Sequence, residues 1–243
     1  MRFAINKAKL IAHTVGMNRH IPAFTAMMLI FALFATIVSN FYIKPHTSLA
    51  EESQKVIYLT FDDGPSDKVT PKILDILKEE NVPATFFIVG KHAETRKDIL
   101  RRAYNEGHTL AVHSYTHNYK EIYKSADTLI EDIEKCNDMI CNITGEYSYL
   151  YRFPGGSYNI APEKIRAVKE LGYEYVDWNA SFRDSELPDP TAGKLYTAAI
   201  STVSNPAKII MLAHDTTDKI ETVWALKEVI RHFKNQGYKF KKF

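Results

Sequence analysis

The sequence predicts an α/β protein built on a parallel sheet. Short apolar runs of strand length alternate with amphipathic helical segments from residue 55 to the C-terminus, and the polar motifs of interest each follow an apolar run. This alternation is typical of either a (β/α) barrel or a doubly wound sheet, and both gather functional residues at the carboxyl ends of their strands. The expected strands are 56–61, 84–89, 109–112, 147–151, 174–178 and 208–213.

Helices are expected between these strands. Thr70-Pro71 is a helix start, since proline fits the first helical turn, and Gly107 and Gly172 follow helical patterns as terminating glycines. Apolar residues at helical spacing predict two more helices, at 126–143 and 222–235.

The N-terminal part of the chain has the pattern of a membrane anchor. Residues 21–43 contain no charged side chain, and as a helix they would span a hydrocarbon core of about 30 Å. The preceding residues 1–20 are basic, which places them in the cytoplasm and the rest outside. We therefore expect a basic tip (1–20), a transmembrane signal anchor (21–43), a linker (44–54) and an exported domain (55–243). A cleaved signal peptide, cut after Ala50, is the alternative.

Charge and cysteine content narrow the function classes. From Lys44 onward the chain has 27 basic and 29 acidic residues, so the exported part is slightly acidic and a nucleic-acid partner is excluded. Cys136 and Cys141 are the only cysteines. They share one helical segment at a spacing poorly suited to a disulfide, and we expect two free thiols.

Two pairs of polar residues follow the first and third expected strands. Asp62 and Asp63 lie in "YLTFDDGPSD". The two adjacent aspartates could belong to a functional site or simply to a turn after the strand, where acidic residues are common. His113 and His117 lie in "LAVHSYTHNY". Two histidines four residues apart on a helical turn point the same way and can share a metal, although this pair alone is weak evidence.

Two further features end the fourth and sixth expected strands. Arg152 begins "RFPGGSYN", a glycine-containing loop with exposed backbone N–H groups, and the arginine can clamp a carboxylate or be an ordinary surface residue. His214 ends "IIMLAH" and would lie at the same carboxyl-end edge of the sheet as the other motifs, unless it is a buried structural histidine. Their common place at strand ends favours a single active site.

A bound cation would explain why two aspartates stand side by side. If Asp63, His113 and His117 bind a divalent metal ion, the positive charge offsets the repulsion between the carboxylates and leaves Asp62 free as a base. Two histidines and one carboxylate with open positions suit metal-assisted hydrolysis.

The chain resembles the polysaccharide deacetylases with the NodB homology domain, carbohydrate esterase family 4. "TFDDGP", "HSYTH", "RFPGGS" and "LAH" are similar to four of the family's motifs, in order, between residues 55 and 243. The resemblance implies a distorted (β/α) barrel of the NodB type. It also implies a general base, Asp62; metal ligands, Asp63, His113 and His117; a residue that orients the base, Arg152; and a general acid, His214.

The sequence departs from the family pattern in two places. The family's fourth motif has an Asp-Trp pair, which spacing aligns with Asp184-Ser185, so Asp184 is the expected catalytic aspartate and the tryptophan is missing. Asp177-Trp178 is the competing alignment. In the third motif, Gly155 stands where many relatives have an aromatic residue; its N–H is expected to bind substrate, while Leu212 is expected to line the acetyl pocket.

The resemblance implies metal-dependent N-deacetylation of N-acetylglucosamine units in a cell-surface polysaccharide. The expected cofactor is one divalent ion, zinc first, with cobalt or another divalent ion as alternatives. A membrane-anchored, extracellular enzyme would reach peptidoglycan. Chitin-type oligosaccharides and O-acetyl xylan are alternative substrates, and an inactive cell-wall binding protein is the non-enzyme alternative, although Asp62, Asp63, His113, His117 and His214 are all present. No protein partner is evident.

Overall fold

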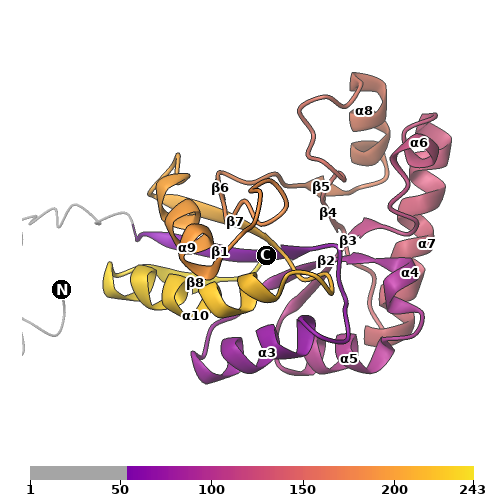
Figure 1. Ribbon diagram of the computed structural model, residues 1–243. Helices are drawn as coiled ribbons and strands as arrows, with labels where there is room; N and C mark the ends of the chain where they lie inside the picture. Colours follow the sequence, from indigo (N-terminus) through magenta and orange to yellow (C-terminus); the bar gives the residue numbers. More distant parts are fainter. Residues whose placement is uncertain (1–53) are drawn as a thin grey trace, which may run out of the picture. The chain divides into compact units, whose positions relative to one another are not determined.

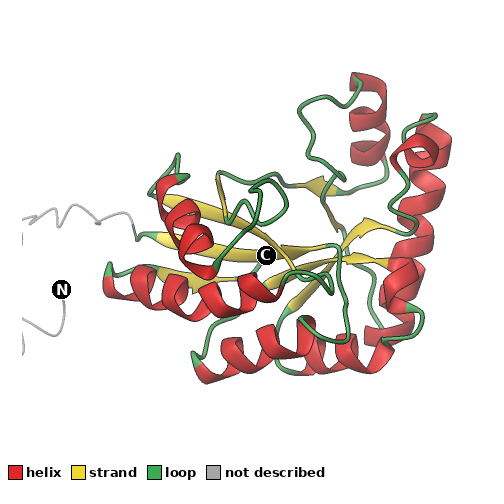
Figure 2. Cartoon of the chain, viewed as in Figure 1, coloured by secondary structure: helices red, strands yellow, loops and turns green. Residues whose placement is uncertain are grey.

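The computed structural model describes residues 54–243, which belong to one compact unit (Figures 1 and 2). The expected tip, anchor and nearly all of the linker lie outside the described residues. Within residues 54–243, no helix combines the length and the apolar character needed to cross a membrane.

Eight strands form one sheet. Most of them are short, and all of their pairings are parallel. The strands are β1 (Val56–Asp62), β2 (Thr85–Val89), β3 (Thr109–Ser114), β4 (Leu150–Tyr151), β5 (Glu174–Tyr175), β6 (Ala180–Ser181), β7 (Lys208–His214) and β8 (Lys239–Lys241).

Helices connect the strands, as the sequence pattern predicts. The longer ones lie along the outside of the sheet in Figure 2. They are α3 (Thr70–Glu79), α4 (Gly90–Ala93), α5 (Lys97–Asn105), α6 (Tyr119–Ile122), α7 (Ala126–Thr144), α8 (Pro162–Glu170), α9 (Ala192–Ser201) and α10 (Ile220–Asn235). Gly107 and Gly172 have φ values of +89° and +85°, the left-handed conformation expected of glycines that follow helices.

The sheet is a curled half-barrel rather than a closed barrel. Its order is β5-β4-β3-β2-β1-β7-β6, and β8 pairs with the beginning of β1, so that β5 and β6 stand at the two ends. The expected distorted barrel is therefore correct as a curled parallel α/β sheet, and the sheet stays open. Ile57, Leu59 and Phe61 of β1 face the hydrophobic core under the helices, whereas Thr60 and Asp62 face the concave side.

Strand lengths differ most from the prediction near the ends of the sheet. The fourth and fifth strands are reduced to two residues each, and β6 and β8 were not predicted. β6 is only Ala180-Ser181, and β8 has the sequence Lys-Phe-Lys, so neither carries an apolar run. Pairing with β7 and β1 respectively makes them strands. Cys136 and Cys141 both lie on α7 and are free thiols.

Candidate active site

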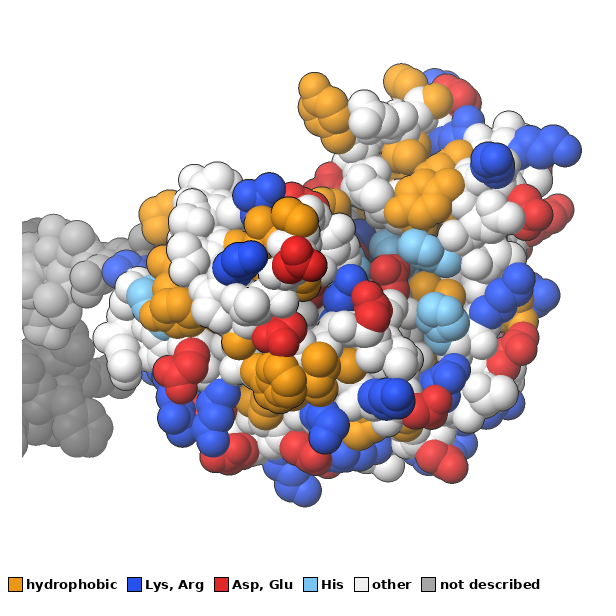
Figure 3. Space-filling view, in the orientation of Figure 1, with side chains coloured by type: hydrophobic (Ala, Val, Ile, Leu, Met, Phe, Trp, Pro, Cys, Tyr) orange, Lys and Arg blue, Asp and Glu red, His pale blue; other side chains and the backbone are white. Residues whose placement is uncertain are grey.

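The polar motifs meet at the carboxyl ends of β1, β3, β4 and β7. This follows from the parallel sheet, because all of its strands end at the same edge. On this face of the domain, histidine side chains reach the surface beside acidic and hydrophobic ones (Figure 3). Asp62 and His214 are register partners on the neighbouring strands β1 and β7, so these two expected catalytic residues lie side by side.

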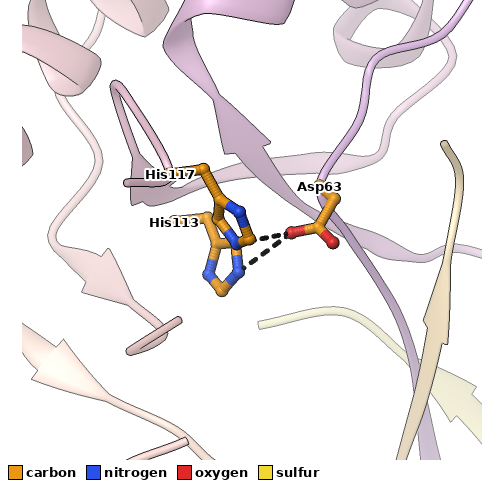
Figure 4. Close-up of side chains that lie close together, drawn as sticks. All are labelled: Asp63, His113 and His117. Atoms are coloured by element: carbon orange, nitrogen blue, oxygen red, sulfur yellow. Dashed lines mark ion pairs between the residues drawn. The ribbon is translucent and has the colours of Figure 1, made fainter. Parts of the chain in front are cut away.

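Asp63, His113 and His117 form a group that could hold a metal ion (Figure 4). Oδ1 of Asp63 lies 3.2 Å from Nε2 of His113 and 3.0 Å from Nε2 of His117. These separations fit ligands around one ion, because tetrahedral bonds of about 2.0–2.1 Å put neighbouring ligand atoms about 3.3 Å apart. Oδ1 of Asp63 is also buried without a hydrogen-bond partner among the described residues.

The charges in this group favour a cation. Burial alone would raise the pKa of Asp63, but the neighbouring imidazoles of His113 and His117 hold that pKa far below its usual value. Burial alone would lower the pKa of His113, but the charges of Asp62 and Asp63 raise it above its usual value. The carboxylates therefore stabilise positive charge at the point where the three side chains meet.

The ring of His113 is oriented by a backbone contact. Its Nδ1 donates a hydrogen bond to the carbonyl oxygen of Arg152 at 2.8 Å. With the proton on Nδ1, the lone pair of the neutral ring is on Nε2, which is the atom that faces Asp63. In this tautomer Nε2 could bind a metal ion.

His117 reaches the group through a loop rather than a helical turn. His113 is in strand β3, and His117 lies beyond its end with a left-handed φ of +55°, so the expected helical arrangement of the pair is wrong. Asp132 on α7 holds this loop, because its carboxylate accepts hydrogen bonds from Ser114 Oγ, Tyr115 N–H and both the N–H and the hydroxyl of Thr116.

The loop contacts bend the chain back towards Asp63. Ser114 Oγ in turn accepts a hydrogen bond from the N–H of His117 at 2.8 Å. Asp63 has a left-handed φ of its own, +73°, just after the end of β1. The two residues therefore approach each other because both of their loops turn, and helical spacing has no part in it.

Arg152 holds Asp62 in a buried contact. Nη1 of Arg152 donates to Oδ1 of Asp62 at 2.8 Å and to Thr60 Oγ1 at 2.8 Å. The arginine side chain is fully buried, its Nε donates to the carbonyl of Val176, and its guanidinium lies 4.1 Å from the ring centroid of Phe87. Oδ2 of Asp62 accepts no hydrogen bond within residues 54–243, which leaves it available to a water molecule.

Asp184, and not Asp177, contacts His214. Oδ1 of Asp184 accepts a hydrogen bond from Nδ1 of His214 at 2.7 Å, and Oδ2 accepts bonds from the His214 N–H and from Thr222 Oγ1. Burial alone would lower the pKa of His214, but Asp184 raises it to about 9. The imidazole is therefore charged at neutral pH and can donate a proton from Nε2.

Asp177 and Trp178 instead hold the loop that carries Gly155. The Asp177 carboxylate accepts hydrogen bonds from the N–H and the hydroxyl of Ser157. Gly156 packs so closely on Trp178 that a Cβ there would lie 3.1 Å from the indole ring. Gly155 and Gly156 both have left-handed φ values, near +80°, which suits glycine. The N–H of Gly155 donates to no acceptor within the described residues.

Leu212 is buried beneath the site. It lies two residues before His214 on β7 and therefore faces the same side of the sheet, next to its register partner Thr60. Its side chain can contribute an apolar floor.

Several residues that build the site were missed in the sequence. Thr60, Asp132 and Thr222 each hold a site residue, but each lies within an ordinary strand or helix pattern. Only Asp132 had a detectable signal, because an acid at an otherwise buried helical position needs partners.

Comparison with known proteins identifies the family. A family model described as polysaccharide deacetylase matches residues 50–176. The chain is 32% identical to the peptidoglycan-N-acetylmuramic acid deacetylase PdaA of Bacillus subtilis, over 79% of this chain and 72% of that protein. It is also 32% identical to a peptidoglycan-N-acetylglucosamine deacetylase of Bacillus cereus, over 79% of this chain and 70% of that protein.

A solved structure agrees with this result. The carbohydrate esterase family 4 enzyme of Streptococcus mutans superposes with a TM-score of 0.74 at 30% identity, over 78% of this chain and 86% of that one. The chain is thus similar to known members of the family in both its sequence and its fold. The chain belongs to the polysaccharide deacetylase family with the NodB homology domain, a family of hydrolases.

Proposed function

We propose that the protein hydrolyses the N-acetyl groups of N-acetylglucosamine residues in peptidoglycan with the help of one divalent metal ion. The observation that carries the proposal is the register pairing of Asp62 with His214 beside the group Asp63, His113 and His117. The proposed base, the proposed acid and the proposed metal ligands therefore lie together at the strand ends, an arrangement that suits metal-assisted hydrolysis of an amide.

Asp63, His113 and His117 would hold the ion, with zinc as the first choice and cobalt or another divalent ion as alternatives. When bound, a divalent ion polarises the acetyl carbonyl and makes the attacking water more acidic. The chain itself supplies the ordered ligands, because Arg152 O orients His113 and Asp132 fixes the loop of His117.

Asp62 is the proposed general base. Its Oδ1 is held by Arg152, while Oδ2 is free to take a proton from the attacking water. The arginine also keeps the buried carboxylate in one orientation, so the accepting oxygen does not have to reorganise during the reaction.

His214 is the proposed general acid. Nδ1 donates to Asp184, so Nε2 carries the proton that passes to the departing amine. The free N–H of Gly155 would donate to the oxygen that becomes negative when the carbonyl is attacked. Leu212 would contact the acetyl methyl group.

The choice of polymer rests on the relatives and on the expected anchor. Two relatives are named for peptidoglycan, one for its N-acetylglucosamine and one for its N-acetylmuramic acid. An anchor at residues 21–43 would keep the domain outside the cell and within reach of peptidoglycan. Chitin-type oligosaccharides and acetylated xylan are the alternative substrates.

Acetate release from purified peptidoglycan tests the proposal. The protein should release acetate, chelator should abolish the release, and added zinc or cobalt should restore it. Dinitrophenylation of the free amines before acid hydrolysis then shows whether glucosamine or muramic acid had lost its acetyl group, because the label survives the acid that removes the remaining acetyl groups. No acetate release with any of the divalent ions would contradict the proposal, and free amines on muramic acid alone would correct the sugar.

A further inference from the structure

Tyr119 lies beside the proposed metal ligand His117 and has no role in the proposed chemistry. It is the first residue of α6, two residues after His117, and its ring packs edge-on against the His117 ring with 5.3 Å between centroids. The residue is 47% exposed, so much of the ring is open to solvent. An open aromatic ring beside catalytic groups is a candidate binding surface.

The same ring also packs on the Gly155 loop. A Cβ at Gly155 would lie 3.1 Å from Cε1 and 3.4 Å from the hydroxyl oxygen of Tyr119. The lack of a side chain at Gly155 therefore leaves room for the Tyr119 ring next to the backbone. Tyr119 lies between the proposed metal ligand His117 and the proposed oxyanion donor Gly155.

The ring of Tyr119 is supported from one side. Tyr123 meets it edge to face at 6.0 Å between centroids, and the Tyr123 hydroxyl donates to the carbonyl of Pro154 at 2.8 Å. These contacts connect α6 to the loop that carries Gly155. A ring that is fixed before binding pays little ordering entropy when it binds a ligand.

We propose that the exposed part of the Tyr119 ring binds a pyranose ring of the substrate and thereby positions its acetamido group. The C–H surface of a pyranose is apolar and rigid, and it packs well on an aromatic ring. This inference rests on the proposed function for the identity of the sugar. Tyr119 would then set the preference for sugar acetamides over small acetyl esters that have no sugar.

Direct binding of a soluble sugar separates this role from catalysis. The probe is the tetrasaccharide of N-acetylglucosamine, titrated calorimetrically into the full-length zinc-loaded protein. Tyr119→Ala should weaken its affinity roughly ten- to fifty-fold, because a contact of 50–100 Å² is lost. Tyr119→Phe, which keeps the ring, should bind within about threefold of the wild type.

A second measurement checks that the metal site is intact. Hydrolysis of p-nitrophenyl acetate, which lacks a sugar, should fall much less in Tyr119→Ala than the tetrasaccharide affinity does, and the variant should retain its zinc. Tyr104→Ala, which removes a partly exposed tyrosine of α5, is the matched control and should change neither result.

The outcomes also separate this inference from the proposed function. Wild-type affinity in Tyr119→Ala, no tetrasaccharide binding by the wild type, or equal losses with the sugar and the ester would overturn the role of Tyr119. If the wild type binds the tetrasaccharide and Tyr119→Ala does not, yet no acetate is released from any acetamido sugar, the binding role stands and the proposed function fails.

Discussion

Asp184 and His214 are joined at two points, because the Asp184 carboxylate accepts hydrogen bonds from both Nδ1 and the backbone N–H of the same histidine. Thr222 Oγ1 donates to the carboxylate as well, and Asp184 is almost fully buried. The pair therefore fixes the ring of His214, its tautomer and its charge together.

The pH dependence of activity should report this pair. The pKa of His214 is raised from 6.5 to about 9, so its proton is available at neutral pH and is lost as the pH rises through that value. We expect kcat/KM to fall on the alkaline side near pH 9, or somewhat lower with metal bound, because a cation opposes the contribution of the nearby carboxylates. Stability gained from the charged ring should be complete below pH 6.5 and disappear between 6.5 and 9.

Asp184→Asn should move the alkaline limb of the kcat/KM profile down by about one unit or more, because the neutral amide no longer stabilises the imidazolium. The measurement is the pH profile of acetate release at saturating zinc. Glu186→Gln, which changes an exposed acid paired with Arg183, should leave the limb in place. An unmoved limb in Asp184→Asn would mean that another group titrates there.

Asp62 and Asp63 should behave differently when each is changed to asparagine. Asp62→Asn should keep the metal and lose roughly 10²- to 10⁴-fold in kcat, because the base is removed and no ligand is lost. Asp63→Asn should weaken zinc affinity, with activity partly recovered at high zinc. Zinc titration and acetate release measure both effects, and loss of zinc in Asp62→Asn with retention in Asp63→Asn would reverse the assignment.

Arg152 should matter to both stability and rate. Arg152→Ala leaves Asp62 buried without its partner, and we expect the free energy of unfolding to fall by about 3–5 kcal/mol in denaturant titrations. Arg152→Lys keeps the charge but cannot reach Val176 O, Thr60 and Asp62 together, so kcat should fall roughly 10- to 100-fold with zinc retained. The exposed Arg183→Lys is the control. A fully active Arg152→Lys would show that orientation of Asp62 does not need the guanidinium.

Asp132 should control metal affinity from outside the ligand set. Asp132→Asn replaces one accepting oxygen by an amide that faces the N–H groups of the His117 loop, so zinc affinity should fall roughly 10- to 100-fold. Competition with a chromogenic chelator measures this directly. Glu131→Gln, on the exposed neighbouring position of α7, should bind zinc like the wild type. Unchanged affinity in Asp132→Asn would show that His117 holds its position without the aspartate.

The sequence by itself determined the fold class and most of the site. Strand and helix periods are local, and Pro71 and Gly107 mark a helix start and the end of another. Parallel strands end at one edge, so residues after separate strands, such as Asp62 and His214, had to meet once the strands were recognised. The carboxylates and imidazoles at those ends then indicated a metal-assisted hydrolase.

The tertiary structure alone decided the contacts that chain spacing does not encode. Spacing left Asp184 and Asp177 as alternatives, and only the packing of β6, β7 and α10 brings Asp184 to His214 while Asp177 holds the Gly155 loop. His117 reaches Asp63 through a left-handed loop held by Asp132. Likewise, Tyr119 lies on Gly155 because two loops from different strands meet. Such contacts depend on where whole elements lie, and a periodic pattern carries no information about that.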